Sequence, residues 1–235
     1  MILLQARGLS REFGGLHAVR NVDFSLDEGE IRAIIGPNGA GKTTFVGLIC
    51  GRIPASAGQV MFRGEDISRL PAHQRVRRGI AYTFQITSVF ANLSVFDNVA
   101  LAAQSHRSAA IDLEAQTHAV LTRVGLIERK DARAATLAYG HQRLLELAMG
   151  LALAPKLLIL DEPTQGLSDY EIAQFCALVR DAATTLTVLL IEHNMDVVMQ
   201  LASRITVMDR GRVLAEGSPE EIRSNTEVQR AYLGS

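Results

Sequence analysis

The sequence predicts an α/β protein with a mostly parallel sheet and an inserted helical segment. Two observations indicate this class. Short aliphatic runs alternate with segments of helical periodicity in residues 1–87 and 156–235, the pattern of strand–helix–strand units. Residues 88–155, between them, are alanine-rich and fit helices only. We therefore expect a single domain over residues 1–235, with a core (1–87 and 156–235) that carries a helical lobe (88–155).

The amino-terminal third is expected to hold mainly strands and turns. Residues 22–26 alternate in polarity, and the aliphatic run 30–35 ends in a glycine-rich loop. A helix begins near Lys42, with apolar side chains at helical spacing, and ends at Gly51. The next expected elements are a strand at 59–63, a short helix at 71–78 and a strand at 79–83.

The remaining elements follow from the same signals. The predicted helices of the lobe are 95–104, 113–124 and 141–153. Beyond it, strands at 157–160, 186–191 and 204–208 alternate with helices at 170–180 and 194–202. Gly211 marks a hairpin turn, and Ser218 with Glu221 forms a capping box that starts a closing helix.

Composition and chain start narrow the classes of function. The formal net charge is -1, so there is no electrostatic case for a general nucleic-acid binder. The first residues do not fit a signal peptide, and no apolar run approaches the roughly 18 residues that cross a bilayer. Cys50 and Cys176 are interpreted as buried thiols in a reducing compartment. We expect a cytosolic chain that reaches a membrane only through a partner.

A phosphate-binding loop is predicted between the run 30–35 and the helix that follows. Its glycines allow backbone amides to approach a polyphosphate, and the helix adds the positive end of its dipole. In this pattern Lys42 contacts the β and γ phosphates, and the Thr43 hydroxyl binds Mg²⁺. The candidate ATP-binding residues here are Gly36, Pro37, Asn38, Gly39, Ala40, Gly41, Lys42, Thr43 and Thr44.

Two acids, Asp161 and Glu162, end the apolar strand at 157–160. Charges next to an apolar core are costly unless they line a functional crevice at the carboxyl end of a sheet. We assign Asp161 to Mg²⁺ and Glu162 to polarising the water that attacks the γ-phosphate. Together with the loop, these acids are typical of nucleotide hydrolases and kinases.

Further segments make the chain resemble the ABC ATPases. Leu137-Ala138-Tyr139-Gly140-His141-Gln142-Arg143 is similar to their signature motif, and Gln85 to the glutamine of their Q-loop. His193 resembles their switch histidine, and Phe13 falls where the family has an aromatic residue against adenine. The resemblance implies a P-loop NTPase (RecA-like) core, the helical lobe and a small amino-terminal antiparallel sheet.

Within that family the chain most resembles the ATP-binding subunits of branched-chain amino acid importers. The similar segments are Arg11-Glu12-Phe13-Gly14-Gly15-Leu16, Tyr82-Thr83-Phe84-Gln85, Leu137-Ala138-Tyr139-Gly140, Glu192-His193-Asn194-Met195 and Arg230-Ala231-Tyr232-Leu233-Gly234. Importers of urea or short amides share much of this pattern. A soluble ABC ATPase outside transport and a small-molecule phosphotransferase are the rival interpretations.

The resemblance implies a mechanism shared between two subunits. Each ATP, with Mg²⁺, would lie between the phosphate loop of one copy and the signature residues of the other, which are Ala138, Tyr139, Gly140 and His141. Glu162, His193 and Gln85 would be catalytic, and Thr43, Gln85 and Asp161 would hold the metal. Partners would be a second ATP-binding subunit, transmembrane permeases and indirectly a solute-binding protein, with no nucleic acid. The location would be the cytoplasmic face of the bacterial inner membrane.

Some residues depart from the family pattern or allow two interpretations. Ala138, Tyr139 and His141 replace the usual signature residues, and Ser168 stands where the D-loop usually has aspartate. Ser168 is either a helix cap with Glu171 or a dimer contact. The apolar residues after Gln85 either line a groove for a permease helix or pack within the lobe; they are Phe90, Leu93, Val95 and Phe96. The remaining predictions are a solvated basic helix face (Arg75, Arg77, Arg78) and ordinary surface or core histidines (His17, His73, His106, His118).

Overall fold

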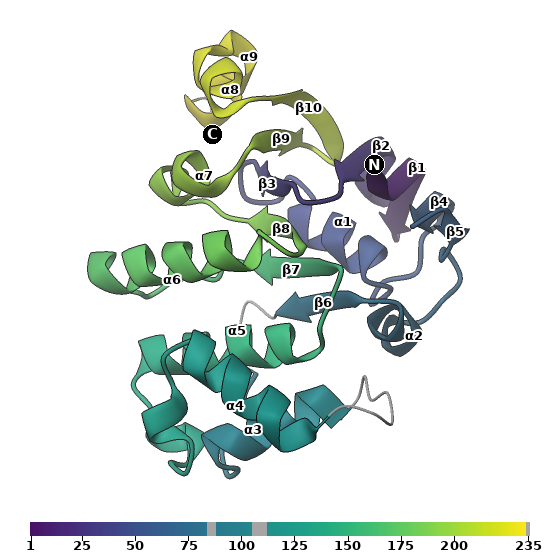
Figure 1. Cartoon of the computed structure of the whole chain (residues 1–235). Coiled ribbons are helices and arrows are strands. Elements are labelled where there is room, and N and C mark those ends of the chain that lie inside the picture. Colours follow the sequence, from purple (N-terminus) through teal and green to yellow (C-terminus); the bar gives the residue numbers. More distant parts are fainter. Residues whose placement is uncertain (84–87, 105–111, 234–235) are drawn as a thin grey trace.

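Two β-sheets form the centre of the molecule, a computed structural model that describes residues 1–83, 88–104 and 112–233 (Figure 1). The strands of the larger sheet, in spatial order, are β10 (Arg212–Gly217), β9 (Arg204–Asp209), β3 (Ile31–Ile35), β8 (Thr187–Ile191), β7 (Leu157–Asp161) and β6 (Ile80–Thr83). All of these pair in parallel except β10, which is antiparallel to β9. The smaller sheet is antiparallel, in the order β2 (Leu16–Asp27), β1 (Ile2–Phe13), β4 (Ala57–Phe62) and β5 (Glu65–Asp66). The predicted fold class is confirmed.

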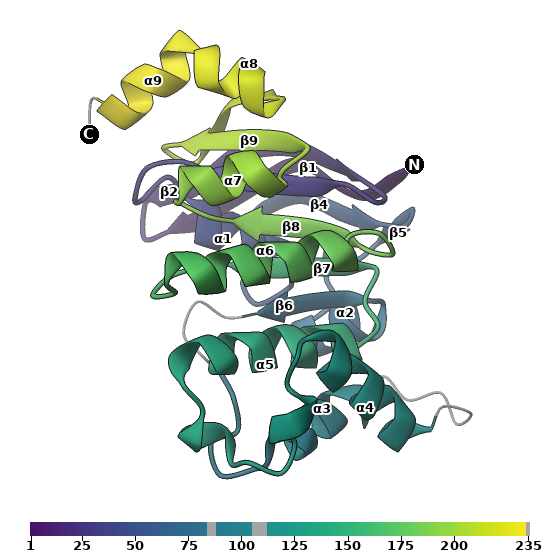
Figure 2. The ribbon, with the colours of Figure 1, turned by 60° about the vertical axis from the view of Figure 1, so that its left-hand side comes forward.

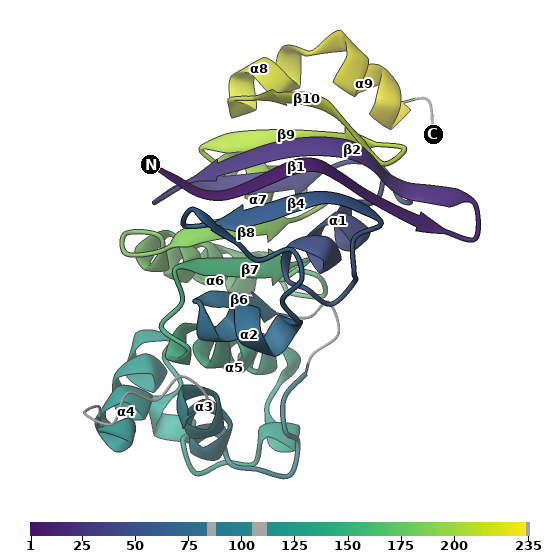
Figure 3. The same cartoon turned by 90° about the vertical axis from the view of Figure 1, so that its right-hand side faces the viewer.

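Helices cover the larger sheet and extend beyond both of its edges (Figure 1). They are α1 (Lys42–Ile49), α2 (Ala72–Arg77), α3 (Val95–Gln104), α4 (Leu113–Arg123), α5 (Tyr139–Ala152), α6 (Asp169–Ala182), α7 (Met195–Leu201), α8 (Pro219–Ser224) and α9 (Thr226–Leu233), with 3-10 turns at Ile127–Arg129 and Ala134–Thr136. Helices α3 to α5 lie past β6, and α8 and α9 lie past β10 (Figure 1). Figure 2 shows α6 and α7 over one face, and Figure 3 shows the smaller sheet on the other side, with α1. No helix in the described ranges is long and apolar enough to span a membrane.

The burial of β7 explains why its sequence is uniformly apolar. Side chains alternate along a strand, so neighbouring residues face opposite sides of the sheet. Leu158 belongs to a core cluster that includes Leu121 of α4 and Phe175 of α6. Ile159 belongs to a second cluster, with Phe45 of α1 and residues of the smaller sheet. Both faces are covered, as is usual for parallel strands.

Most elements lie within a few residues of their predicted bounds. The structure differs from the predictions in one strand and in the exposure of one side chain. The long strand β1 was not predicted from its own pattern, because its pairing with β2 is broken by four register shifts that disturb the alternation. The interpretation of Arg75 as solvated is wrong, since it is 3% exposed. Its guanidinium donates to the carbonyls of Leu48 and Ile49 at the end of α1, and so supplies partners that helix carbonyls lack.

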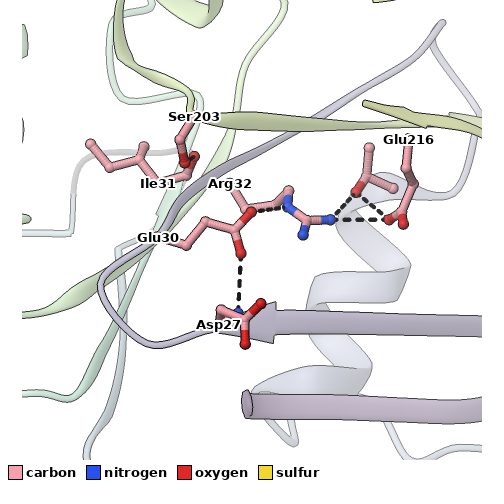
Figure 4. Close-up of polar contacts among 7 residues, drawn as sticks. Asp27, Glu30, Ile31, Arg32, Ser203 and Glu216 are labelled. Atoms are coloured by element: carbon pink, nitrogen blue, oxygen red, sulfur yellow. Dashed lines mark hydrogen bonds and ion pairs between the residues drawn. The ribbon is translucent and has the colours of Figure 1, made fainter. Parts of the chain in front are cut away.

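A buried ionic network ties the amino end of β3 to β9 and β10 (Figure 4). Arg32 is 2% exposed and donates to Glu30 (Nε–Oε1, 2.6 Å), to the Thr206 hydroxyl (3.0 Å) and to Glu216 (3.1 Å). Thr206 also donates to Glu216, and Glu30 accepts from the amide of Asp27. A buried charge is tolerable when it is paired and hydrogen-bonded in this way.

Candidate functional site

The sheet topology brings the predicted site segments to one edge. The spatial order β3–β8–β7 consists of parallel neighbours, so their carboxyl ends meet at the same edge. The phosphate-binding loop follows β3, the acids Asp161 and Glu162 stand at the end of β7, and His193 follows β8. Residues that are far apart in the sequence are thereby gathered into one site.

The phosphate-binding loop is held in place by two neighbouring segments. Gly41 has φ of 97° and stands directly before α1, and a Cβ on it would overlap the carbonyl oxygen of Ala18 in β2. The amide of Gly211, in the turn between β9 and β10, donates to the carbonyl of Ala40 at 2.9 Å. The amide of Arg20 in turn donates to the carbonyl of Gly211 at 2.8 Å. Glycine is therefore required at position 41 both for its conformation and for space.

The ammonium group of Lys42 lies inside the loop. Its side chain is mostly buried, and Nζ donates to the carbonyls of Gly36 (2.6 Å) and Pro37 (3.1 Å). Burial lowers the pKa of Lys42, which the nearby carboxylates of Glu162 and Asp161 partly oppose. Stronger acceptors such as phosphate oxygens would compete for these hydrogen atoms.

Asp161 has one carboxylate oxygen engaged and one available. Oδ2 accepts from the hydroxyl of Tyr82 at 2.6 Å, whereas buried Oδ1 has no hydrogen-bond partner in the described part of the chain. Burial raises the pKa of Asp161, and the charge of Glu162 raises it further. A buried orphan oxygen needs an explanation, and a metal ion or its bound water would supply the partner.

Mg²⁺ fits this donor set. In the described ranges no three His, Cys, Asp or Glu side chains form a cluster of the kind that encloses a metal. Mg²⁺ does not require one, since it usually binds one or two protein oxygens and completes its shell with water and substrate phosphates. Asp161 and the exposed hydroxyl of Thr43 provide such a pair of hard oxygen donors.

Glu162 and His193 face each other across adjacent strand ends. His193 Nδ1 lies 3.8 Å from Glu162 Oε2. The histidine side chain is 58% exposed and the glutamate 18% exposed, so both are accessible from outside. Glu162 has φ of 48°, a conformation uncommon for a residue with a side chain, and its amide donates to the carbonyl of Ile191. Strained backbone of this kind is frequent at functional sites.

A hollow of about 520 Å³ lies over the loop. Its lining includes Asn38 to Thr44 of the loop and helix α1, together with Glu162 and Arg210. The β2 side is formed by Leu16, His17, Ala18 and Arg20. His17 therefore borders the site, although its sequence suggested an ordinary surface or core histidine. Nothing in the local sequence pattern would have indicated this for His17 or Arg210, because β2 and the turn after β9 reach the loop through tertiary contacts.

Phe13 does not line that hollow. It is 43% exposed, and the guanidinium carbon of Arg11 lies 4.4 Å from the centre of its ring. Arg11 and Phe13 therefore form a cation–π contact at the surface, in which the ring stays partly exposed. Adenine stacking by Phe13 stays a prediction.

The signature residues lie apart from the phosphate loop within one chain. Gly140 and His141 line a different hollow, of about 410 Å³, with Ser168, Tyr170 and Glu171. Ala138 is the N-cap residue of α5 and provides no side-chain cap, so the amide groups of the first turn keep their capacity to donate. Tyr139 is 43% exposed, and Ser168 forms the predicted capping box with Glu171. One chain alone thus does not bring the two predicted ATP contacts together.

The segment after β6 is only partly described. Gln85, the predicted catalytic and metal-binding glutamine, lies outside the described residues. The next described residue, Ser88, donates its amide to Glu146 of α5, which pairs with Arg143 at 2.9 Å. Of the apolar residues that follow, Val95 is buried and Phe90 is 50% exposed. Both earlier interpretations of this group, groove and internal packing, therefore remain open for its individual members.

Glu192 is a further acid near the site, and its role was not predicted from the sequence. It follows β8, is 1% exposed, and accepts hydrogen bonds from the residues around the site. A charged residue at the end of an apolar strand was the signal that singled out Asp161 and Glu162, and the same signal applies to Glu192.

Comparisons with known proteins agree along the whole chain. Residues 19–165 match the family model described as ABC transporter, and residues 212–235 match that of the branched-chain amino acid ATP-binding cassette transporter. The high-affinity branched-chain amino acid transport ATP-binding protein LivG of Escherichia coli is 39% identical over 251 residues, which cover 99% of this chain and 98% of LivG. The lipopolysaccharide export system ATP-binding protein LptB of Escherichia coli is 34% identical, over 100% and 98% of the two chains. The crystal structure of the ADP conformation of MJ1267, an ATP-binding cassette of an ABC transporter, superposes with a TM-score of 0.90 at 26% identity and covers all of both chains.

Proposed function

The chain belongs to the ABC transporter family of ATP-binding proteins, and from this membership we propose that it powers the uptake of branched-chain amino acids through separate permease subunits. Subunits of this family bind and hydrolyse ATP to drive transport, and this chain is such an ATPase. The observation that carries the proposal is the single edge on which the phosphate loop, Asp161, Glu162 and His193 meet.

The residues of that edge divide the reaction between them. Lys42 and the loop amides bind the β and γ phosphates. Glu162 orients and polarises the attacking water, and its partly exposed side chain borders the hollow where the triphosphate would lie. His193, 3.8 Å from that carboxylate, contacts the γ-phosphate and keeps water and phosphate aligned. Gln85 would assist as a ligand of the metal ion and of the attacking water.

Asp161 and Thr43 would hold Mg²⁺, with Gln85 as a further ligand. When bound, the ion would supply positive charge against the phosphate oxygens. The orphan oxygen of Asp161 and the hydroxyl bond from Tyr82 support this assignment. The Tyr82 hydroxyl engages Oδ2 of Asp161 and leaves Oδ1 as the oxygen that would bind the metal ion or its water.

Members of this family work as dimers with transmembrane partners, and we assign the second ATP contact to the signature of a second subunit. The separation of Gly140 and His141 from the loop hollow supports this assembly. Ala138, Tyr139, Gly140 and His141 would contact the γ-phosphate bound to the partner's loop, chiefly through helix-end amides. Residues 1–235 would act as one domain, with core 1–87 and 156–235 and lobe 88–155, on the cytoplasmic face of the bacterial inner membrane.

Branched-chain amino acids are the proposed cargo because of the relatives. LivG and the family model at the carboxyl terminus share that description, whereas LptB belongs to a lipopolysaccharide export system. The cargo is selected by the permease and an external binding protein. Urea or a short amide, moved by the same motor, is the second candidate.

Replacing Glu162 with glutamine tests the ATPase mechanism. Glutamine preserves size but cannot polarise water as a carboxylate does, so turnover should fall by about 100-fold or more. ATP should still bind, and the trapped complex should elute from a sizing column as a dimer. A variant that stays monomeric with ATP and hydrolyses it normally would contradict the proposal.

Reconstitution tests the cargo. The chain, combined with its co-purifying membrane proteins and binding protein in proteoliposomes, should drive ATP-dependent accumulation of labelled leucine, isoleucine or valine. Accumulation of urea or acetamide instead would transfer the role to the second candidate. Liposomes that contain the Glu162→Gln chain serve as the matched control.

A further inference from the structure

We propose that Glu192 is a positioning residue for ATP hydrolysis: its buried carboxylate joins the segment that carries Glu162 to the segment that carries His193. The inference rests on the proposed function, because it assumes that these two residues are catalytic. Glu192 has no role in the mechanism proposed above, so the inference extends that mechanism by one residue.

The contacts of Glu192 are divided evenly between the two segments. Oε1 accepts from the amide (3.1 Å) and the hydroxyl (2.5 Å) of Thr164, two residues after Glu162. Oε2 accepts from the amides of His193 (3.1 Å) and Asn194 (3.2 Å). One carboxylate therefore receives four hydrogen bonds, two from each segment.

Burial makes these bonds specific for a carboxylate. Glu192 is 1% exposed and Thr164 is 4% exposed, so water has little access to replace a lost contact. All four groups are donors, and an ionised carboxylate is the side chain that accepts on both oxygens. A glutamine would place its NH₂ group against at least one backbone amide on either side: it would lose the amide bond from Thr164, or both bonds from His193 and Asn194.

The position of this contact indicates a catalytic purpose. The backbone at Glu162 is strained, with φ of 48°, and its amide is bonded to the carbonyl of Ile191, directly before Glu192. Two links thus connect the segments, one through the backbone and one through the Glu192 side chain. The Glu162 and His193 side chains that approach to 3.8 Å belong to the residues so connected. Without the carboxylate, only the backbone link would remain, and the two segments would be held less firmly relative to each other.

The competing explanation is that Glu192 only stabilises the fold. A stabilising role would lower the free energy of unfolding without a selective effect on the chemical step. A positioning role lowers kcat while the ATP affinity, set mainly by the loop, is kept. The two are therefore separable by the division between kcat and KM.

The experiment compares Glu192→Gln with Glu30→Gln in the chain assembled with its permease partners. Glu30 is a suitable control because it too accepts a backbone amide and pairs internally, but at the amino end of the sheet. For Glu192→Gln we expect kcat to fall by about 10- to 100-fold, with KM for ATP within about twofold of the wild type. Glu30→Gln should lose stability without a change in kcat.

A second pair of variants covers the case in which Glu192→Gln does not fold. Thr164→Val removes the hydroxyl donor and should lower kcat, whereas Thr164→Ser keeps the donor and should restore it. Normal kcat in Glu192→Gln or in Thr164→Val overturns the inference, and so does a parallel loss in Thr164→Ser. Glu162→Gln, run alongside, separates the two proposals: if it also turns over normally, the catalytic assignment itself has failed.

Discussion

The two ends of the larger sheet differ in whether their buried charged groups have hydrogen-bond partners within the protein. At the amino end of β3, Arg32 is surrounded by acceptors on Glu30, Thr206 and Glu216. At the carboxyl end of the same sheet, Asp161 keeps one buried oxygen without a partner among the described residues. Lys42, close by, uses carbonyls of its own loop as acceptors. The first arrangement is complete in itself, and the second is completed by a ligand.

This difference separates stability from function within one sheet. A fully bonded ion network lowers the energy of the folded state relative to a broken network, whereas an incomplete one leaves the folded state less stable until a ligand binds. Burial raises the pKa of Asp161 and lowers that of Lys42, which shows that both charges are held at a cost. The cost is located where a triphosphate and a metal ion would offset it.

The largest expected effect comes from removing the complete network's cation. Arg32→Met leaves the mostly buried carboxylate of Glu30 and the more exposed one of Glu216 without their partner, and should lower the free energy of unfolding by about 3 kcal/mol in urea titrations. Arg78→Met is the control, since Arg78 and Glu65 form an exposed pair worth about 1 kcal/mol or less. Similar losses in both variants would remove the distinction between the two ends of the sheet. Adding Glu30→Gln and Glu216→Gln to Arg32→Met should recover part of the loss.

Removing the cation of the incomplete end should affect binding more than stability. Lys42→Met loses two charge-assisted hydrogen bonds to phosphate of about 1.5 kcal/mol or more each, so the Kd for ATP should rise by about 100-fold or more. Calorimetric titration with ATP measures this. Lys156→Met changes an exposed lysine at the other end of β7 and should leave the Kd unchanged. A Lys42→Met chain that binds ATP normally would remove Lys42 from the site.

The smallest effect should be a gain in stability. Asp161→Asn removes a buried charge while its amide oxygen can still accept from Tyr82, so the ligand-free protein should gain about 1 kcal/mol at pH 7. The pKa of Asp161 is higher in the folded state than in the unfolded state. Wild-type stability therefore decreases as the pH rises from the unfolded-state pKa to the folded-state pKa. The gain from asparagine should therefore shrink as the pH falls toward the unfolded-state pKa. Thermal denaturation between pH 4 and pH 8 checks this, and a gain independent of pH would contradict it.

The sequence predicted what is local and missed what tertiary contacts create. The phosphate loop and the acids at the end of β7 could be predicted because each lies next to its strand in the sequence. The burial of Arg75 is not visible in the sequence because two of the carbonyls that accept from it belong to α1, 26 and 27 residues away along the chain. Glu192 had no visible role because Thr164, its main donor, precedes it by 28 residues. The bulges of β1 concealed a strand that only its pairing with β2 and β4 reveals.

The support of the phosphate loop has a consequence for how the protein is made. The loop emerges early from the ribosome, yet β3 is paired with β8 and β9, and the Gly211 amide that holds Ala40 comes still later. A growing chain therefore cannot finish its nucleotide cradle until the last strands have been translated. Competence to bind ATP should therefore appear only in the nearly full-length polypeptide.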